Sequence, residues 1–111
     1  MNVILFGATG NIGRLVTDEL LKAGHKVTAF ARTPENLKIQ DYSLRYHKGN
    51  VLEPKDVFEA VDGHDAVVIA LGAGMSRKST VRSLGTLNIV NAMQAKGIRR
   101  LVCQSTLGAH E

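Results

Sequence analysis

The sequence predicts an α/β fold in which helices cover both faces of a doubly wound parallel sheet, giving a three-layer α/β/α arrangement. Two observations support this prediction. Apolar runs rich in Val, Ile and Leu alternate with stretches of helical periodicity along the whole chain. The clearest runs, Val3–Phe6 and Asp65–Leu71, are almost continuously apolar, as expected for parallel strands that are buried on both faces.

The boundaries of the elements are marked mainly by glycine and proline. Gly24, Gly63 and Gly97 stand where helices end, and Pro54 stands where one begins. The expected strands are Val3–Phe6, Lys26–Ala31, Leu44–His47 (nearer a sheet edge), Asp65–Leu71 and Arg100–Gln104. The first expected helix is Asn11–Ala23, with Ile12, Leu15, Val16 and Leu20 at helical spacing. The second runs from Pro54 to Gly63, with Val57, Phe58 and Val61 on one face, and the third runs from about Thr80 to Lys96. A short turn or helix is also expected from Thr33-Pro34.

A sheet of this kind with six strands needs at least one more helix and strand after the fifth strand. The chain ends at Glu111, a few residues beyond that strand. We therefore expect residues 1–111 to be the N-terminal part of a longer protein.

A glycine-rich segment lies directly between the first strand and the first helix. It has the spacing G-x-x-G-x-x-G, one residue longer than G-x-G-x-x-G. Glycine allows a tight turn and a close backbone approach to a pyrophosphate, while the helix N-terminus supplies unpaired N–H groups. The segment predicts a Rossmann-type dinucleotide loop, with a glycine-rich turn that binds nothing as the alternative. The predicted cofactor contacts are Gly7, Thr9, Gly10, Asn11, Ile12 and Gly13.

The end of the second strand predicts which dinucleotide binds. An acidic residue there accepts a hydrogen bond from the ribose 2′-hydroxyl and repels a 2′-phosphate. This chain instead has Arg32, about twenty residues beyond the glycine loop, followed by Thr33. A guanidinium is a planar, charge-assisted clamp for phosphate, so we expect NADP(H) to be preferred over NAD(H). Arg14 either helps to bind this phosphate or is a solvated helix residue. If Arg32 is only a surface arginine, the preference between NADP(H) and NAD(H) stays open.

These features resemble the atypical short-chain dehydrogenase/reductase superfamily, in its NAD(P)-binding, NmrA-like branch. The similarity runs across the chain and corresponds to roughly the first half of such a protein, most like the flavin-reductase type to which biliverdin reductase B belongs. The stretches that carry the resemblance are Phe6-Gly7-Ala8-Thr9-Gly10, Gly49-Asn50-Val51, Asp65-Ala66-Val67-Val68-Ile69, Thr80-Val81 and Asn88-Ile89-Val90.

The resemblance implies further cofactor contacts beyond the glycine loop. Asn50, at a position that is usually Asp in relatives, lies at the adenine edge, with Val51 against the ring. An amide can still form a hydrogen bond with the adenine amino group. Ala70, Leu71 and Gly72, at the end of the fourth strand, run beside the nicotinamide ribose.

Ser105 and Thr106 are the catalytic candidates that the resemblance implies, because the superfamily places a hydroxyl near the nicotinamide at the end of the fifth strand. The alternative for both is a strand-end hydroxyl that bonds the local backbone. Neither Tyr42 nor Tyr46 begins the Tyr-x-x-x-Lys pattern of many short-chain dehydrogenases. In the flavin-reductase type that pair is missing, and the protein orients a cofactor that carries the chemistry.

Composition argues against several other classes of protein. The net charge is +4, but the Lys and Arg residues are scattered without interleaved aromatics, which favours a mildly basic surface over nucleic-acid binding. No apolar run approaches the ~20 residues of a membrane span, and no basic segment precedes the apolar N-terminus as in a secretory signal. Cys103 is the single cysteine, and a cytoplasmic location is expected. No metal site is expected, because metal-ligand spacing is missing among His25, His47, His64 and His110.

The expected function is an NADPH-dependent reductase that transfers hydride to a flavin, quinone-like or tetrapyrrole acceptor, a small-molecule partner. Two alternatives stay open. One is a non-catalytic, NADP-sensing regulator of the NmrA-like kind. The other is a nucleotide-sugar epimerase or dehydratase, which requires a Tyr-x-x-x-Lys pair beyond residue 111. All three rest on family resemblance more than on local chemistry.

Overall fold

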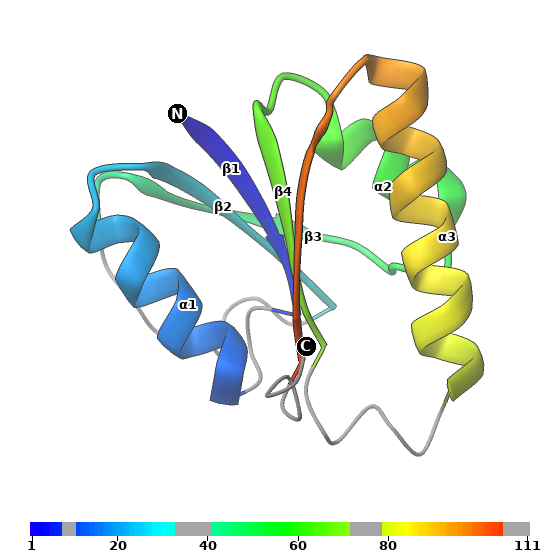
Figure 1. Cartoon of the computed structure of the whole chain (residues 1–111), viewed down its shortest axis with the longest axis horizontal. Helices are drawn as coiled ribbons and strands as arrows, with labels where there is room; N and C mark the ends of the chain where they lie inside the picture. Colours follow the sequence, from blue (N-terminus) through cyan, green and yellow to red (C-terminus); the bar gives the residue numbers. More distant parts are fainter. Residues whose placement is uncertain (8–10, 33–40, 72–78, 106–111) are drawn as a thin grey trace.

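The computed structural model describes residues 1–7, 11–32, 41–71 and 79–105, and these form one parallel sheet with helices on both sides (Figure 1). The strand order is β3-β2-β1-β4-β5. Because the order reverses between β1 and β4, the sheet is doubly wound and the predicted Rossmann-type fold is confirmed. The strands are β1 (Asn2–Phe6), β2 (Lys26–Ala31), β3 (Leu44–Lys48), β4 (Ala66–Leu71) and β5 (Arg100–Ser105), and the helices are α1 (Asn11–Lys22), α2 (Pro54–Val61) and α3 (Ser79–Lys96).

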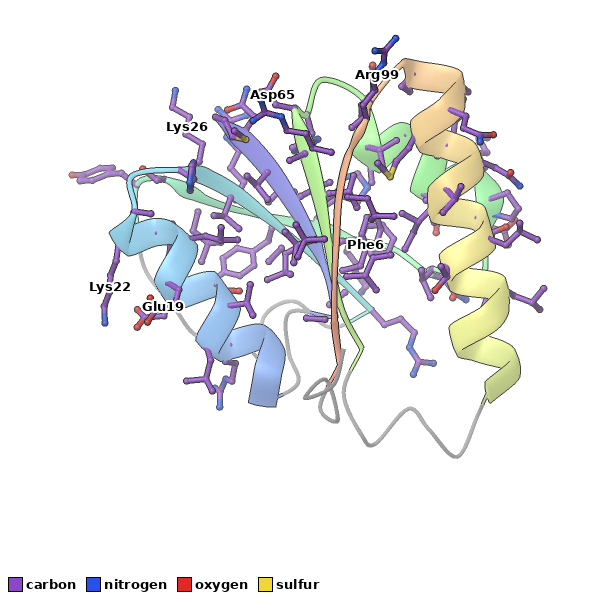
Figure 2. The ribbon with its side chains drawn as sticks, viewed as in Figure 1. Phe6, Glu19, Lys22, Lys26, Asp65 and Arg99 are labelled. Atoms are coloured by element: carbon purple, nitrogen blue, oxygen red, sulfur yellow. The ribbon has the colours of Figure 1, made fainter. Side chains whose placement is uncertain are left out.

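Each face of the sheet has its own apolar core. Successive side chains of a strand point to opposite faces, so Leu5 contributes to the core beneath α1, whereas Ile4 and Phe6 contribute to the core beneath α2 and α3. Figure 2 shows Phe6 on the side of the sheet that α3 covers. Burying an aliphatic or aromatic side chain of this size contributes roughly 1.5–3 kcal/mol, so the buried residues of β1 stabilise both cores.

The glycines expected to end helices do so. Gly24 has a φ of 88°, in the left-handed region. Its N–H donates to the Leu21 carbonyl at 3.0 Å, and the His25 N–H donates to the Leu20 carbonyl at 3.1 Å. These two bonds form a Schellman motif, which satisfies carbonyl groups that the end of α1 leaves free. The predicted stop at Gly24 is therefore confirmed.

Two side chains expected on buried helix faces are exposed instead. Leu15 is 65% exposed, because α1 turns Val16, Leu20 and Leu21 toward the core. Phe58 is 43% exposed, since Ala60 occupies the position on α2 that faces the sheet. The Lys96 ammonium lies 4.2 Å from the centre of the Phe58 ring, so this ring packs against α3 at the surface.

Gly49, just beyond β3, lies so close to Phe30 that a side chain cannot fit without a shift. A Cβ at this position would lie 2.8 Å from two atoms of the Phe30 ring. The ring is itself held between Phe6, at a centroid distance of 4.7 Å, and His47, at 5.4 Å. We expect Gly49→Ala to lower the free energy of unfolding by about 1–3 kcal/mol, as measured in urea. Unchanged stability would mean that the ring can move freely.

Candidate functional site

The carboxyl ends of the strands bring the predicted cofactor residues to one edge of the sheet. Register pairs Phe6 of β1 with Phe30 and with Ile69, so Gly7, the end of β2 and the end of β4 lie side by side. Leu71 and Ser105 pair across β4 and β5 at the same edge. In Figure 1 it is the lower edge of the sheet. Parallel sheets of this order bind ligands outside the carboxyl ends of their strands.

The N-terminus of α1 lies at this edge, because α1 begins four residues after Gly7 ends the run from β1. Gly7 follows β1 with a φ of 86°, a left-handed conformation that disfavours a side chain, and α1 begins at Asn11. No acidic residue occupies the first turn of α1, whereas the first turn of α2 carries Asp56. The first N–H groups of a helix have no partner within it, and its positive dipole end favours an anion. This end of α1 therefore suits a diphosphate, with Gly13 buried in its first turn.

Arg32 is exposed immediately beyond β2 at the same edge. The ion pairs in the described part of the chain join Lys22 to Asp18 and Lys96 to Asp62, and neither includes Arg32. Within the described ranges no carboxylate neutralises this guanidinium. Its predicted role as a clamp for the 2′-phosphate stays a prediction.

The segment that follows β3 is held by a dense set of hydrogen bonds. The Asn50 N–H donates to an Asp56 carboxylate oxygen at 3.0 Å, and the Asn50 side-chain oxygen accepts from the Leu52 N–H at 2.9 Å. This second bond orients the Asn50 amide, because only the oxygen can accept from an N–H. One lone pair of the Asn50 oxygen thus accepts from Leu52, and an adenine amino group would have to use the other. The expected contact of Asn50 with the adenine stays a prediction.

The remaining predicted site residues are described only in part. Ala70 is buried in the core beneath α1, so it can meet a cofactor only through its backbone. For Asn11, Ile12, Leu71 and Ser105 the structure describes the backbone alone. Thr9, Gly10, Thr33, Gly72 and Thr106 lie outside the described residues.

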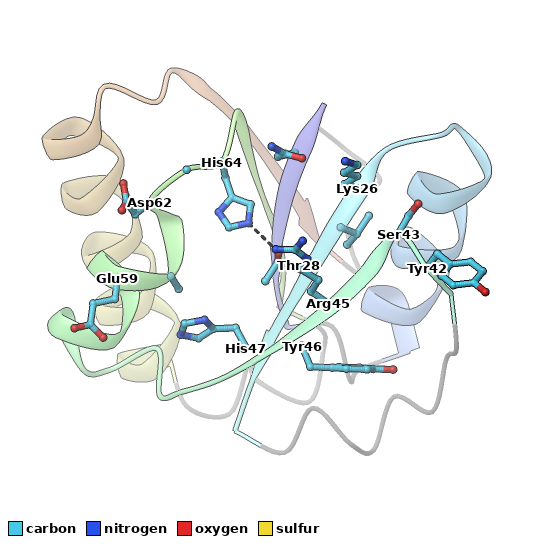
Figure 3. Close-up of a pocket in the computed structure, with 14 residues that line it drawn as sticks. Lys26, Thr28, Tyr42, Ser43, Arg45, Tyr46, His47, Glu59, Asp62 and His64 are labelled. Carbon is cyan, nitrogen blue, oxygen red and sulfur yellow. Dashed lines mark hydrogen bonds between the residues drawn. The ribbon is translucent and has the colours of Figure 1, made fainter.

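A groove of about 540 Å³ lies at the opposite edge of the sheet, where the strands begin, between β2, β3 and α2 (Figure 3). The sequence analysis did not predict this groove. The alternation of polar and apolar residues along β3 is a signal for it, because Arg45 and His47, which line the groove, share the face opposite Leu44. His64 lies in this groove, and its Nε2 is 2.8 Å from the hydroxyl of Thr28 (Figure 3). Because parallel sheets bind nucleotides at the other edge, the groove is separate from the candidate site.

Burial lowers the pKa of His64 from its ordinary value of 6.5, and this outweighs the opposite effect of nearby carbonyls such as that of Val61. The folded state therefore favours the neutral ring, while the unfolded state takes up a proton near pH 6.5. This contribution to stability is complete above pH 6.5 and is lost as the pH falls toward the folded pKa. We expect the melting temperature of the protein to fall between about pH 7 and pH 5 more steeply than that of His64→Gln. Parallel curves for the two proteins would contradict this.

The described residues contain no cluster of three His, Cys, Asp or Glu side chains that could hold a metal ion. Among the helices that the structure describes, none is both long and apolar enough to cross a membrane.

The fold and the edge just described define a Rossmann-type nucleotide-binding domain. A family model described as NAD(P)H-binding matches residues 7–111, and the chain belongs to this NAD(P)H-binding family.

Curated proteins and solved structures are similar to this chain over 90% or more of its length. The chain is 30% identical over 115 residues to photosystem II assembly factor Ycf39 of Synechocystis, covering 100% of this chain and 35% of that protein. It is 34% identical over 113 residues to a 2-alkyl-3-oxoalkanoate reductase of Stenotrophomonas maltophilia, and this match covers 96% of this chain and 33% of the reductase. The solved structure of a Rossmann-fold NAD(P)-binding family protein from Shigella flexneri is 29% identical to this chain, with a TM-score of 0.76. The match covers 90% of this chain and 49% of that protein. The chain thus spans a third to a half of the length of these relatives.

Proposed function

We propose that the protein is an NADPH-dependent reductase that transfers hydride to a flavin, quinone-like or tetrapyrrole acceptor. The observation that carries the proposal is the meeting of three features at the carboxyl edge: the left-handed turn at Gly7, the N-terminus of α1 without an acidic residue in its first turn, and Arg32, which pairs with no carboxylate among the described residues. Together they match the charge and shape of a dinucleotide with a phosphate on its ribose.

The cofactor would lie across the carboxyl ends of the strands. Its diphosphate would bind the amides at the start of α1, and its 2′-phosphate would meet Arg32, with Thr33 beside it. Its adenine would lie at Asn50 and Val51. The nicotinamide would then extend toward the end of β4, near Ala70, Leu71 and Gly72.

The bound nicotinamide would supply a hydride, and the protein would supply position and exclusion of water. Reduction of a flavin by NADPH also consumes one proton, which the chain's Tyr42 and Tyr46 do not offer through a Tyr-x-x-x-Lys pair. Ser105 and Thr106, at the end of β5, would place the acceptor or a water that delivers this proton. The similarity to a relative named as a reductase supports this class of reaction.

The test is a reduction assay with the purified protein, NADPH and a panel containing FMN, a quinone, a tetrapyrrole and a 3-oxo acid. We expect loss of the NADPH absorbance with at least one of the first three acceptors. With NADPH deuterated on one face of C4, the NADP⁺ product should either lose or keep the deuterium completely, because the hydride leaves from one face of the ring. If only the 3-oxo acid is reduced, the proposed flavin, quinone-like or tetrapyrrole acceptor is wrong.

A second candidate is a protein that binds NADPH without using it. The relative named as an assembly factor favours this candidate, because it matches the whole chain and is not named as an enzyme. Saturable binding of NADPH, with no turnover of any acceptor in the panel, would favour this candidate over the reductase.

A further inference from the structure

The face of α3 that packs against the core is apolar toward its C-terminal end and less apolar toward its N-terminal end. Near its C-terminal end this face is apolar, with Ile89, Ala92 and Met93 buried in the core beneath α2 and α3. One turn closer to the carboxyl edge of the sheet, the positions that continue the same stripe are Gly85 and Asn88. An apolar stripe that only filled the core would have continued with residues such as Leu or Ala.

These two residues meet the segment that follows β3. The Asn88 side-chain N–H₂ donates to the Val51 carbonyl at 3.0 Å, across 37 residues of sequence. A Cβ on Gly85 would lie 3.1 Å from both γ-carbons of Val51. Gly85 thus lets the helix approach Val51, and Asn88 bonds its backbone.

Both residues are costly inside a helix. Glycine is about 1 kcal/mol less favourable than alanine in a helix interior, and asparagine is also a weak helix former. Their place on the inner face of α3, against Val51, indicates that the contact outweighs this cost. The other bonds of the segment, at Asn50 and Leu52, hold it to α2 and to itself, whereas Asn88 holds it to α3.

We infer that Asn88 is a positioning residue for the adenine half of the nucleotide site: it fixes the backbone of Val51 at the place where the base binds, and Gly85 provides the space. This inference rests on the proposed function. Because α3 follows the segment that leaves β4, the same helix connects the adenine side of the edge to the nicotinamide side. Asn88 acts through Val51 and does not itself touch the reacting atoms.

The test compares Asn88→Ala with Asn91→Ala by calorimetric titration of the purified protein with NADPH and with adenosine 2′,5′-bisphosphate. Asn91 lies on the exposed face of the same helix, so both variants change the helix propensity equally. We expect Asn88→Ala to raise the Kd of both ligands by the same factor, roughly five- to tenfold, and Asn91→Ala to leave both unchanged. Asn88→Asp keeps the size of the side chain but lacks the donor, so at neutral pH it should lose at least as much affinity.

Several results would overturn the inference. Equal affinities in the Asn88 and Asn91 variants would do so, as would wild-type affinity in Asn88→Asp. A loss for NADPH without a matching loss for the bisphosphate would place the effect outside the adenine half. If Asn88→Ala does not fold, Gly85→Ala gives the same comparison, because its methyl group would press on Val51. A wild-type protein that binds neither ligand would instead reject the proposed function itself.

Discussion

Gly7→Ala should abolish most of the affinity for NADPH, with a rise in Kd on the order of 100-fold. Gly7 has a φ of 86°, where an L-residue is strained by about 1–2 kcal/mol. Relief of that strain would rotate the peptide that leads from β1 toward α1. The amides at the start of α1 would then no longer converge on the diphosphate, and the new methyl group would stand where the phosphate approaches.

Gly24→Ala is the matched control for this variant. Its φ of 88° is nearly the same, and nothing lies within 4 Å of a Cβ there, so it carries the same backbone strain without any obstruction. We expect both variants to lose similar stability in urea unfolding, and Gly24→Ala to bind NADPH as the wild type does. If the two variants lose affinity equally, the effect is general destabilisation and Gly7 has no role in binding.

Arg32→Ala should weaken NADPH binding by roughly 10- to 100-fold and leave NADH binding within about twofold, since hydrogen bonds to charged groups contribute about 1.5–3 kcal/mol. The reason is that only NADPH carries the 2′-phosphate that this guanidinium would meet. Arg32→Asp should go further and favour NADH, because a carboxylate accepts from a ribose hydroxyl and repels a phosphate. Fluorescence titration with both cofactors measures the ratio directly.

Arg99→Ala controls for the loss of one positive charge. Arg99 precedes β5 at the amino edge of the sheet, the same edge at which Lys26 and Asp65 are labelled in Figure 2. Its removal changes the net charge as Arg32→Ala does, but at the edge opposite the candidate site. Equal losses for NADPH and NADH in Arg32→Ala, or an equal effect of Arg99→Ala, would reject the phosphate clamp.

Most of the fold could be predicted from local pattern, because its determinants are local. The alternation of apolar runs with helical periodicity located all five strands, and Gly24, Gly63 and Gly97 marked helix ends that the structure confirms with positive φ angles. The carboxyl-edge residues could also be predicted, since the ends of parallel strands must meet at one edge.

The errors arose where tertiary packing decides between neighbouring positions. Leu15 and Phe58 have the hydrophobicity of core residues, but the helices turn Val16, which is partly buried, and Ala60, which is buried, toward the sheet instead. The contact of Asn88 with Val51 joins residues 37 positions apart, so the local pattern of α3 does not specify its partner. The orientation of the Asn50 amide likewise depends on a bond to Leu52 that residue type alone does not specify.

The most direct test of the nucleotide site is to map amide chemical-shift changes by NMR as NADPH is added to the isotope-labelled protein. We predict saturable changes at Gly7, at the start of α1, at Arg32 and at Asn50–Val51, all at the carboxyl edge. The amides of Asn2, Lys26 and His64, at the opposite edge, should stay nearly unchanged. Changes confined to that opposite edge, or no changes at millimolar NADPH, would contradict the central claim that the start of α1 and its neighbouring strand ends bind the cofactor.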